Sequence, residues 1–93
     1  MSRKIKLKPP WNHLAPTQLM MINPRLYAKL EVTNPTGSIK DRPVSYIVKK
    51  AIDAGDLTPE TVLVEASSGN TGISLCAIGA SLGLPTKIVM PSN

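Results

Sequence analysis

Two strand-like runs separated by one helical run place the strongest constraint on the fold of this chain. Residues 61–66 (TVLVEA) and 86–90 (TKIVM) are short and largely apolar, as in buried parallel strands. Between them the sequence predicts a helix over residues 71–82, apolar on nearly every face and therefore buried, which Gly83 ends. A strand, a helix and a second strand in this order form a parallel pair with a right-handed crossover.

A further strand and helix precede this unit. Residues 26–32 (LYAKLEV) alternate in polarity and predict a strand, and residues 34–37 (NPTG) predict a turn. The apolar positions of residues 42–54 follow one helical face, and Pro43 is tolerated only in the first turn of such a helix. The order βαβαβ therefore predicts an α/β fold, a partial parallel sheet with flanking helices.

Two predicted loops, residues 34–40 and 67–71, lead from a strand into a helix. The carboxyl ends of parallel strands lie at one edge of a sheet, where ligands bind. The second loop places hydroxyl groups, a glycine and an amide at a helix start, whose free N–H groups attract anions. The first loop ends in Lys40, whose amine can form a Schiff base with a carbonyl compound. Taken alone, both features also fit an ordinary helix cap and a solvated lysine.

The literal residues of these loops resemble a known family. Residues 34–42 (NPTGSIKDR) resemble the lysine motif of fold type II pyridoxal-phosphate (PLP) enzymes, and residues 65–72 (EASSGNTG) resemble their substrate-carboxylate loop. The resemblance runs from about residue 14 to the end. Residues 41–43 (DRP) and 89–93 (VMPSN) are most similar to the cysteine synthase (O-acetylserine sulfhydrylase) branch. Threonine synthases and serine dehydratases share most of the pattern and remain alternatives.

The resemblance implies a role for each matching residue. Lys40 would bind the PLP cofactor covalently and act as general base, and Asn70 would hydrogen-bond the cofactor's ring hydroxyl. Asp41 and Arg42 are expected only to cap and charge-balance the helix start. The implied reaction is β-replacement on an activated serine such as O-acetylserine, with sulfide adding to give cysteine. The substrate carboxylate would be bound by Ser67, Ser68, Gly69 and Thr71.

The chain departs from the family pattern in two places. The usual opening Gly-Asn-Thr-Pro-Leu appears as residues 15–19 (APTQL). In the family, the glycine-rich loop that binds the cofactor phosphate follows the equivalent of residue 93, and the 93 residues contain no other glycine-rich run. We therefore expect the chain to be a truncated N-terminal region of this family. It would be either a truncated cysteine synthase or a non-catalytic fragment or assembly module. An exposed sheet edge would favour self-association as a dimer.

Composition and charge limit the partners and the location. Four of the eleven basic residues lie in residues 1–8, and no finger or arginine stripe indicates nucleic-acid binding. No apolar stretch approaches the roughly 20 residues of a membrane helix or the length of a signal-peptide core. The single cysteine, Cys76, is expected to be a small buried residue and fits the cytoplasm.

These limits leave a small-molecule amino-acid substrate as the expected partner, and no metal ligands occur at a recognisable spacing. A nucleotide-binding unit is a weaker alternative, because no G-x-G-x-x-G motif is present. We expect residues 1–13 to form a basic, proline-containing tail and residues 14–93 to form the partial α/β domain.

Overall fold

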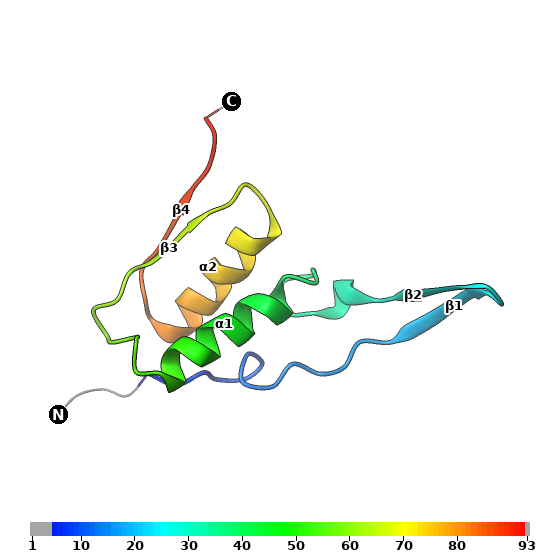
Figure 1. Cartoon of the computed structure of the whole chain (residues 1–93), viewed down its shortest axis with the longest axis horizontal. Helices are drawn as coiled ribbons and strands as arrows, with labels where there is room; N and C mark the ends of the chain where they lie inside the picture. The colour runs from blue at the N-terminus through cyan, green and yellow to red at the C-terminus, as the bar shows by residue number, and fades with distance from the viewer. Residues whose placement is uncertain (1–4, 93) are drawn as a thin grey trace.

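The computed structural model describes residues 5–92, in which two helices lie side by side and one of them packs against a pair of strands (Figure 1). A separate hairpin extends from this body as an arm. The elements in chain order are β1 (Leu19–Asn23), β2 (Leu26–Lys29), the short 3-10 helix η1 (Glu31–Thr33), α1 (Asp41–Asp53), β3 (Leu63–Ala66), α2 (Asn70–Leu82) and β4 (Thr86–Val89).

The predicted parallel pair is present. β3 and β4 pair in parallel, with Leu63 opposite Thr86 and Ala66 opposite Val89, and α2 forms the crossover between them. Alternate residues of both strands are half-buried, as expected for strands covered on one face. The α/β class with a small parallel sheet and flanking helices is therefore confirmed.

A glycine allows α2 to lie close to this sheet. A Cβ atom added at Gly79 would lie 2.1 Å from Thr86 Oγ1 and 3.3 Å from Leu63 Cδ1. Any larger residue would force Thr86 to change its rotamer or push the helix away from the strands. After Leu82 the helix ends at Gly83, whose φ of 72° is the left-handed conformation that glycine adopts easily.

The apolar core lies between α1 and α2, which pack against each other. As the position of Pro43 predicted, α1 begins at Asp41. Two residues of the predicted tail also pack into this core, so part of segment 1–13 contributes to the folded body. The buried apolar residues are Leu7, Trp11, Val44, Val48, Ile78, Leu82 and Leu84.

The first predicted strand is placed differently from the βαβαβ expectation. β2 ends at Lys29 and pairs antiparallel with β1, not with the β3–β4 sheet. Only Pro24 and Arg25 separate the two strands, and a connection of two residues allows antiparallel pairing alone. The arm carries many exposed apolar side chains: Leu19, Met20, Met21, Ile22, Leu26 and Tyr27.

Helix α2 is not buried on every side. Ile78 is fully buried, but Ile73 is 55% exposed and Cys76 is also exposed, which corrects the expectation of a buried cysteine. α1 and the β3–β4 sheet cover two sides of α2, and no other element among residues 5–92 covers the side that carries Ile73 and Cys76. Neither helix within these residues is long and apolar enough to cross a membrane.

Candidate functional site

The serine-rich loop after β3 is ordered by its own first residue. The backbone N–H of Ser67 donates to the carbonyl of Val89 on β4 at 3.0 Å. The Ser67 Oγ atom accepts hydrogen bonds from the N–H groups of Gly69 (3.2 Å) and Gly72 (3.1 Å). Because the first N–H groups of a helix have no acceptor inside it, Ser67 satisfies one of them and holds the loop over the start of α2.

The remaining residues of this predicted site surround the amino end of α2. Ser68, Gly69 and Asn70 are exposed, and Thr71 is half-buried. The backbone N–H groups of Asn70 and Thr71 have no hydrogen-bond acceptor among the described residues. They are therefore free to bind an anionic group from outside, at the end of the helix where the dipole favours negative charge.

A depression of about 430 Å³ lies beside this loop. Its volume falls within the roughly 300–1,000 Å³ of small-molecule sites. The serine loop forms its polar end and apolar side chains form the rest, whereas Lys40 is not among its lining residues. Those residues are Ser67, Ser68, Gly69, Gly72, Ile73, Cys76, Ile88 and Met90.

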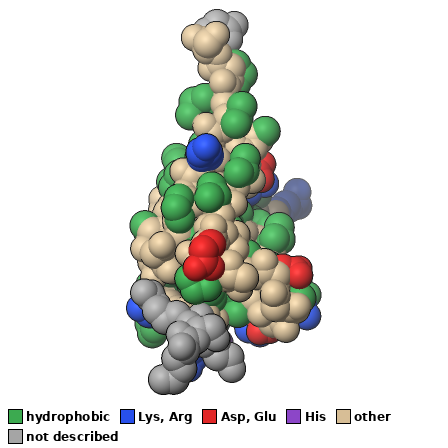
Figure 2. Space-filling view, turned by 90° about the vertical axis from the view of Figure 1, so that its left-hand side faces the viewer, with side chains coloured by type: hydrophobic (Ala, Val, Ile, Leu, Met, Phe, Trp, Pro, Cys, Tyr) green, Lys and Arg blue, Asp and Glu red, His purple; other side chains and the backbone are tan. Residues whose placement is uncertain are grey.

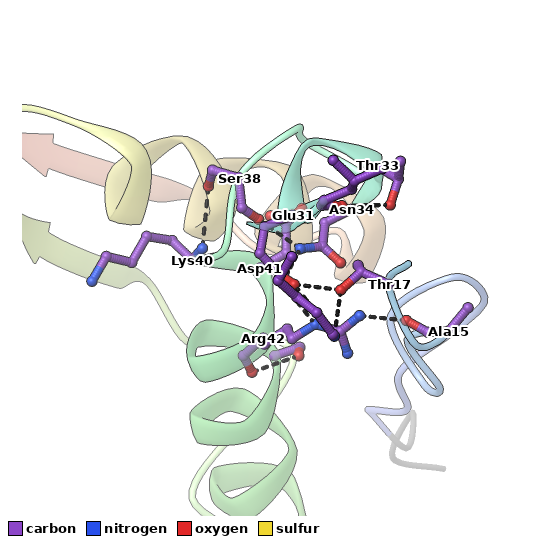
Figure 3. A network of polar contacts seen from close by, with 12 residues as sticks. Ala15, Thr17, Glu31, Thr33, Asn34, Ser38, Lys40, Asp41 and Arg42 are labelled. Carbon is purple, nitrogen blue, oxygen red and sulfur yellow. Dashed lines mark hydrogen bonds and ion pairs between the residues drawn. The ribbon is translucent and has the colours of Figure 1, made fainter. Parts of the chain in front are cut away.

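Lys40 lies on the other predicted loop, directly before α1. It is exposed, and its backbone N–H donates to Ser38 Oγ at 3.2 Å. Its side chain runs away from the polar cluster around Asp41 and Arg42 (Figure 3). The ion pairs between described residues do not include Lys40, so its amine is accessible to a ligand.

A buried carboxylate joins the lysine loop to helix α2. Asp41 is 0% exposed and accepts hydrogen bonds from the backbone N–H of Thr36 (2.7 Å), from Thr36 Oγ1 (2.5 Å) and from Ser74 Oγ (2.7 Å). Ser74 lies on α2, one turn after Asn70. The expectation that Asp41 caps α1 is corrected, because its carboxylate accepts no N–H group of that helix. It instead connects the lysine loop to the helix whose start carries the serine loop.

This connection was missed from the sequence. The signal for it was a polar residue, Ser74, within the otherwise apolar run of α2, together with an aspartate at the first position of α1. A buried serine needs a hydrogen-bond partner, and a buried carboxylate needs donors. Each satisfies the other here.

A second carboxylate, Glu31, lies at the base of the arm. It accepts hydrogen bonds from Thr17 Oγ1, from Asn34 Nδ2 (3.1 Å) and from Arg42 Nε (3.2 Å), and Lys29 Nζ lies 3.7 Å away. The hydrogen bonds from Thr17 and Asn34, followed by those from Arg42 and the charge of Lys29, lower the pKa of Glu31 from 4.5 to about 2. Since the folded state lowers this pKa, the carboxylate stabilises the fold above pH 4.5. That contribution is lost as the pH falls through about 2.

Fold and site together define an α/β protein with an accessible amine on one loop and a helix start with free N–H groups on the other, where one buried carboxylate ties the first loop to that helix. Such a pair suits an anionic ligand that carries a carbonyl group. Residues 11–93 match the family described as pyridoxal-phosphate dependent enzyme, and the chain belongs to this family.

Individual relatives are cysteine synthases and related enzymes. The chain is 46% identical over 68 residues to the cysteine synthase of Aquifex aeolicus, covering 73% of the chain and 21% of the relative. It is 49% identical over 73 residues to cystathionine beta-synthase of Saccharomyces cerevisiae, covering 77% of the chain and 14% of the relative. The chain thus spans about a fifth or less of these proteins.

Solved structures agree with this assignment. The fold is similar to that of cysteine synthase (OASS) from Entamoeba histolytica, with a TM-score of 0.81, 35% identity, and coverage of 100% of this chain and 31% of the other. A hydrogen sulfide-producing enzyme from Fusobacterium nucleatum gives a TM-score of 0.80 at 38% identity, covering 89% and 30%. The fold type II architecture implied by the two loop motifs is confirmed.

The residues present fit PLP. The accessible amine of Lys40 suits the cofactor's aldehyde, and the exposed amide of Asn70 suits a ring hydroxyl. Residues 5–92 contain no group of three or more His, Cys, Asp or Glu side chains placed to hold a metal ion.

Proposed function

We propose that this chain supplies the cofactor lysine and the substrate-carboxylate loop of a PLP-dependent cysteine synthase. The substrate would be an activated serine such as O-acetylserine, and sulfide would be the second reactant. The observation that carries the proposal is the buried Asp41, which hydrogen-bonds both Thr36 of the lysine loop and Ser74 of α2. The cysteine synthases among the relatives support the choice of reaction.

When bound, PLP supplies an electron sink for negative charge at the substrate's α-carbon. Lys40 would hold the cofactor through its Nζ atom and, once released, take the proton from that carbon. Asn70 would orient the ring by a hydrogen bond to its hydroxyl. The substrate carboxylate would be bound by Ser67, Ser68, Gly69 and Thr71.

The geometry of the loop favours this division of roles. The Ser67 oxygen already accepts two backbone N–H groups, so its own hydrogen is left to donate toward a carboxylate. Ser68 is exposed and uncommitted within the described residues, and the free N–H of Thr71 points from a helix start. A carboxylate bound here would replace the missing acceptors of α2.

The test is cofactor attachment at one lysine. After incubation with PLP and removal of excess, the chain is expected to show a visible absorbance band that Lys40→Ala lacks, because only Lys40 has the loop around it. Lys50→Ala removes an exposed lysine from α1, the helix that follows Lys40, and should keep the band. An equal band in Lys40→Ala would sink the proposal.

A second candidate is a non-catalytic fragment or assembly module of the same family, since the 93 residues contain no glycine-rich run for the cofactor phosphate. Turnover of O-acetylserine and sulfide distinguishes the two, because a module would bind PLP and release no cysteine.

The chain contains a single cysteine residue, Cys76, which fits a reducing compartment. We therefore infer that the protein acts in the cytoplasm.

We also infer that the chain self-associates. Within residues 5–92 the β3–β4 sheet has two strands, and Val64 and Val89 on its outer face are 62% and 60% exposed. Hydrophobic side chains gather along the upper part of this side of the molecule (Figure 2). Unpaired strand edges beside apolar surface favour pairing with another chain.

Sedimentation measures this directly. The average mass is expected to rise from monomer toward dimer with increasing concentration, and Val64→Lys should shift the rise to higher concentration by placing a charge on the outer face. A constant monomer mass across a hundredfold range of concentration would contradict self-association.

A further inference from the structure

We propose that Glu31 is a positioning residue for Lys40, acting through Asn34 and Ser38. This inference rests on the proposed function, in which Lys40 is the cofactor lysine. The contacts that carry it lie in one network, drawn in Figure 3.

The network is a relay of hydrogen bonds along the lysine loop. Asn34 is 7% exposed, and its Nδ2 atom donates to Glu31 Oε1 at 3.1 Å and to the carbonyl of Ser38 at 3.0 Å. Ser38 in turn accepts the backbone N–H of Lys40 on its Oγ atom at 3.2 Å. The loop also turns at Gly37, whose N–H donates to the carbonyl of Asn34 at 2.9 Å.

Glu31 fixes the start of this relay. An asparagine amide can rotate by 180° and exchange its oxygen and nitrogen, and only a partner that accepts hydrogen bonds selects the observed orientation. The Glu31 carboxylate is such a partner, and it is held in turn by Arg42 and Thr17. With Asn34 held, its side-chain nitrogen donates to the Glu31 carboxylate and to the Ser38 carbonyl.

The position of the Lys40 amine depends mainly on the backbone of the loop that carries it. The Lys40 side chain makes no ion pair among the described residues, so nothing there holds the amine directly. Asp41 anchors the end of the loop to α2, and Glu31 anchors its beginning to the base of the arm. Loss of Glu31 should therefore loosen the loop around Lys40 while Asp41 still holds the two helices together.

Amide hydrogen exchange of the cofactor-free chain tests the relay. In Glu31→Ala we expect the amides of Gly37 and Lys40 to exchange at least tenfold faster, with exchange inside α2 unchanged. Glu31→Gln should restore most of the protection, since its side-chain oxygen can still accept from Asn34. Lys49→Met, which removes an exposed lysine that pairs with Asp53 and not with Glu31, should match the wild type.

Two results would overturn the proposal. One is exchange at Gly37 and Lys40 within twofold of wild type in Glu31→Ala, and the other is equally faster exchange throughout α2. If Glu31→Ala does not fold, Asn34→Asp breaks the next link by placing a second carboxylate opposite Glu31. It must then show the same local increase.

A chemical readout separates this proposal from the assignment of Lys40. Borohydride traps PLP on lysines, and peptide mass spectrometry gives the fraction on Lys40 relative to other lysines. We expect Glu31→Ala to lower that ratio at least fivefold and Glu31→Gln to recover part of it. A wild-type ratio without preference for Lys40 would count against the proposed function alone, and the exchange rates would still decide whether Glu31 holds the loop.

Discussion

Replacement of Asp41 by alanine is expected to lower the free energy of unfolding by about 3 kcal/mol or more. The fully buried carboxylate accepts three hydrogen bonds, from two groups of Thr36 and from the Ser74 hydroxyl. Each buried donor left without an acceptor costs about 1–3 kcal/mol, although water entering the cavity offsets part of this. A domain of this kind has a total stability of roughly 5–15 kcal/mol, so the loss is a large share of it.

Urea unfolding followed by circular dichroism measures this effect. Asp53→Ala is the matched control, because it removes an aspartate from the other end of α1 whose side chain is 59% exposed. It should change stability by less than about 0.5 kcal/mol. Ser74→Ala should give an intermediate loss of about 1 kcal/mol, since Asp41 keeps its contacts to Thr36. Similar values for Asp41→Ala and Asp53→Ala would show that the link between the helices contributes little.

Trp11→Ala is expected to be the second strongly destabilising substitution, with a loss of about 3 kcal/mol. Trp11 is 7% exposed and packs in the core with Leu7, Val44 and Val48. Removal of a large aromatic side chain from a core costs about 3–5 kcal/mol, and the lower end applies because Trp11 also borders a surface depression. A residue in a solvated tail would show almost no effect.

Tyr46→Ala provides the aromatic control for this prediction. Tyr46 is 61% exposed on α1, and its main contact is Lys50, whose Nζ lies 5.4 Å from the ring centroid. Such an exposed cation–π contact is worth about 0.5–1 kcal/mol. If both substitutions fall within that range, residues 5–13 do not contribute to the stability of the folded body.

The elements with strong local signals were predictable from the sequence. Pro43 limits the start of α1 to the residues just before it, and α1 begins at Asp41. β3 and β4 were also predicted, with ends shifted by one or two residues. In each case a residue with a restricted backbone, or a short apolar run beside a turn, determined the local structure.

The hairpin could not be predicted in this way. Residues 19–23 (LMMIN) are mainly apolar and lack the alternation that marks a half-buried strand, so β1 gave no clear signal. Because β1 was not recognised, the strand at residues 26–32 had no predicted antiparallel partner. It was therefore assigned to the parallel sheet. The same limitation applies to Leu7 and Trp11, which lie among basic residues and prolines and reach the core only through tertiary packing.

The predicted site residues remain predictions, although the structure shows where each lies. The two loops could be identified because each motif, residues 34–42 and residues 65–72, is a continuous stretch of the sequence. Asp41 and Glu31 were not identified as organising residues, since their partners Ser74, Thr17 and Arg42 lie between 11 and 33 positions away. Contacts over such distances depend on the fold and cannot be recognised from spacing.

The extended arm of β1 and β2 also affects how the molecule moves through solution. A compact chain of 93 residues has a radius of gyration of about 12 Å. This chain has 15.5 Å and measures 56 Å along its longest axis. Its friction with water is therefore higher than its 10.0 kDa mass suggests, and its rotational diffusion is slower. A gel-filtration column, which separates by hydrodynamic radius, would overestimate the mass of the monomer.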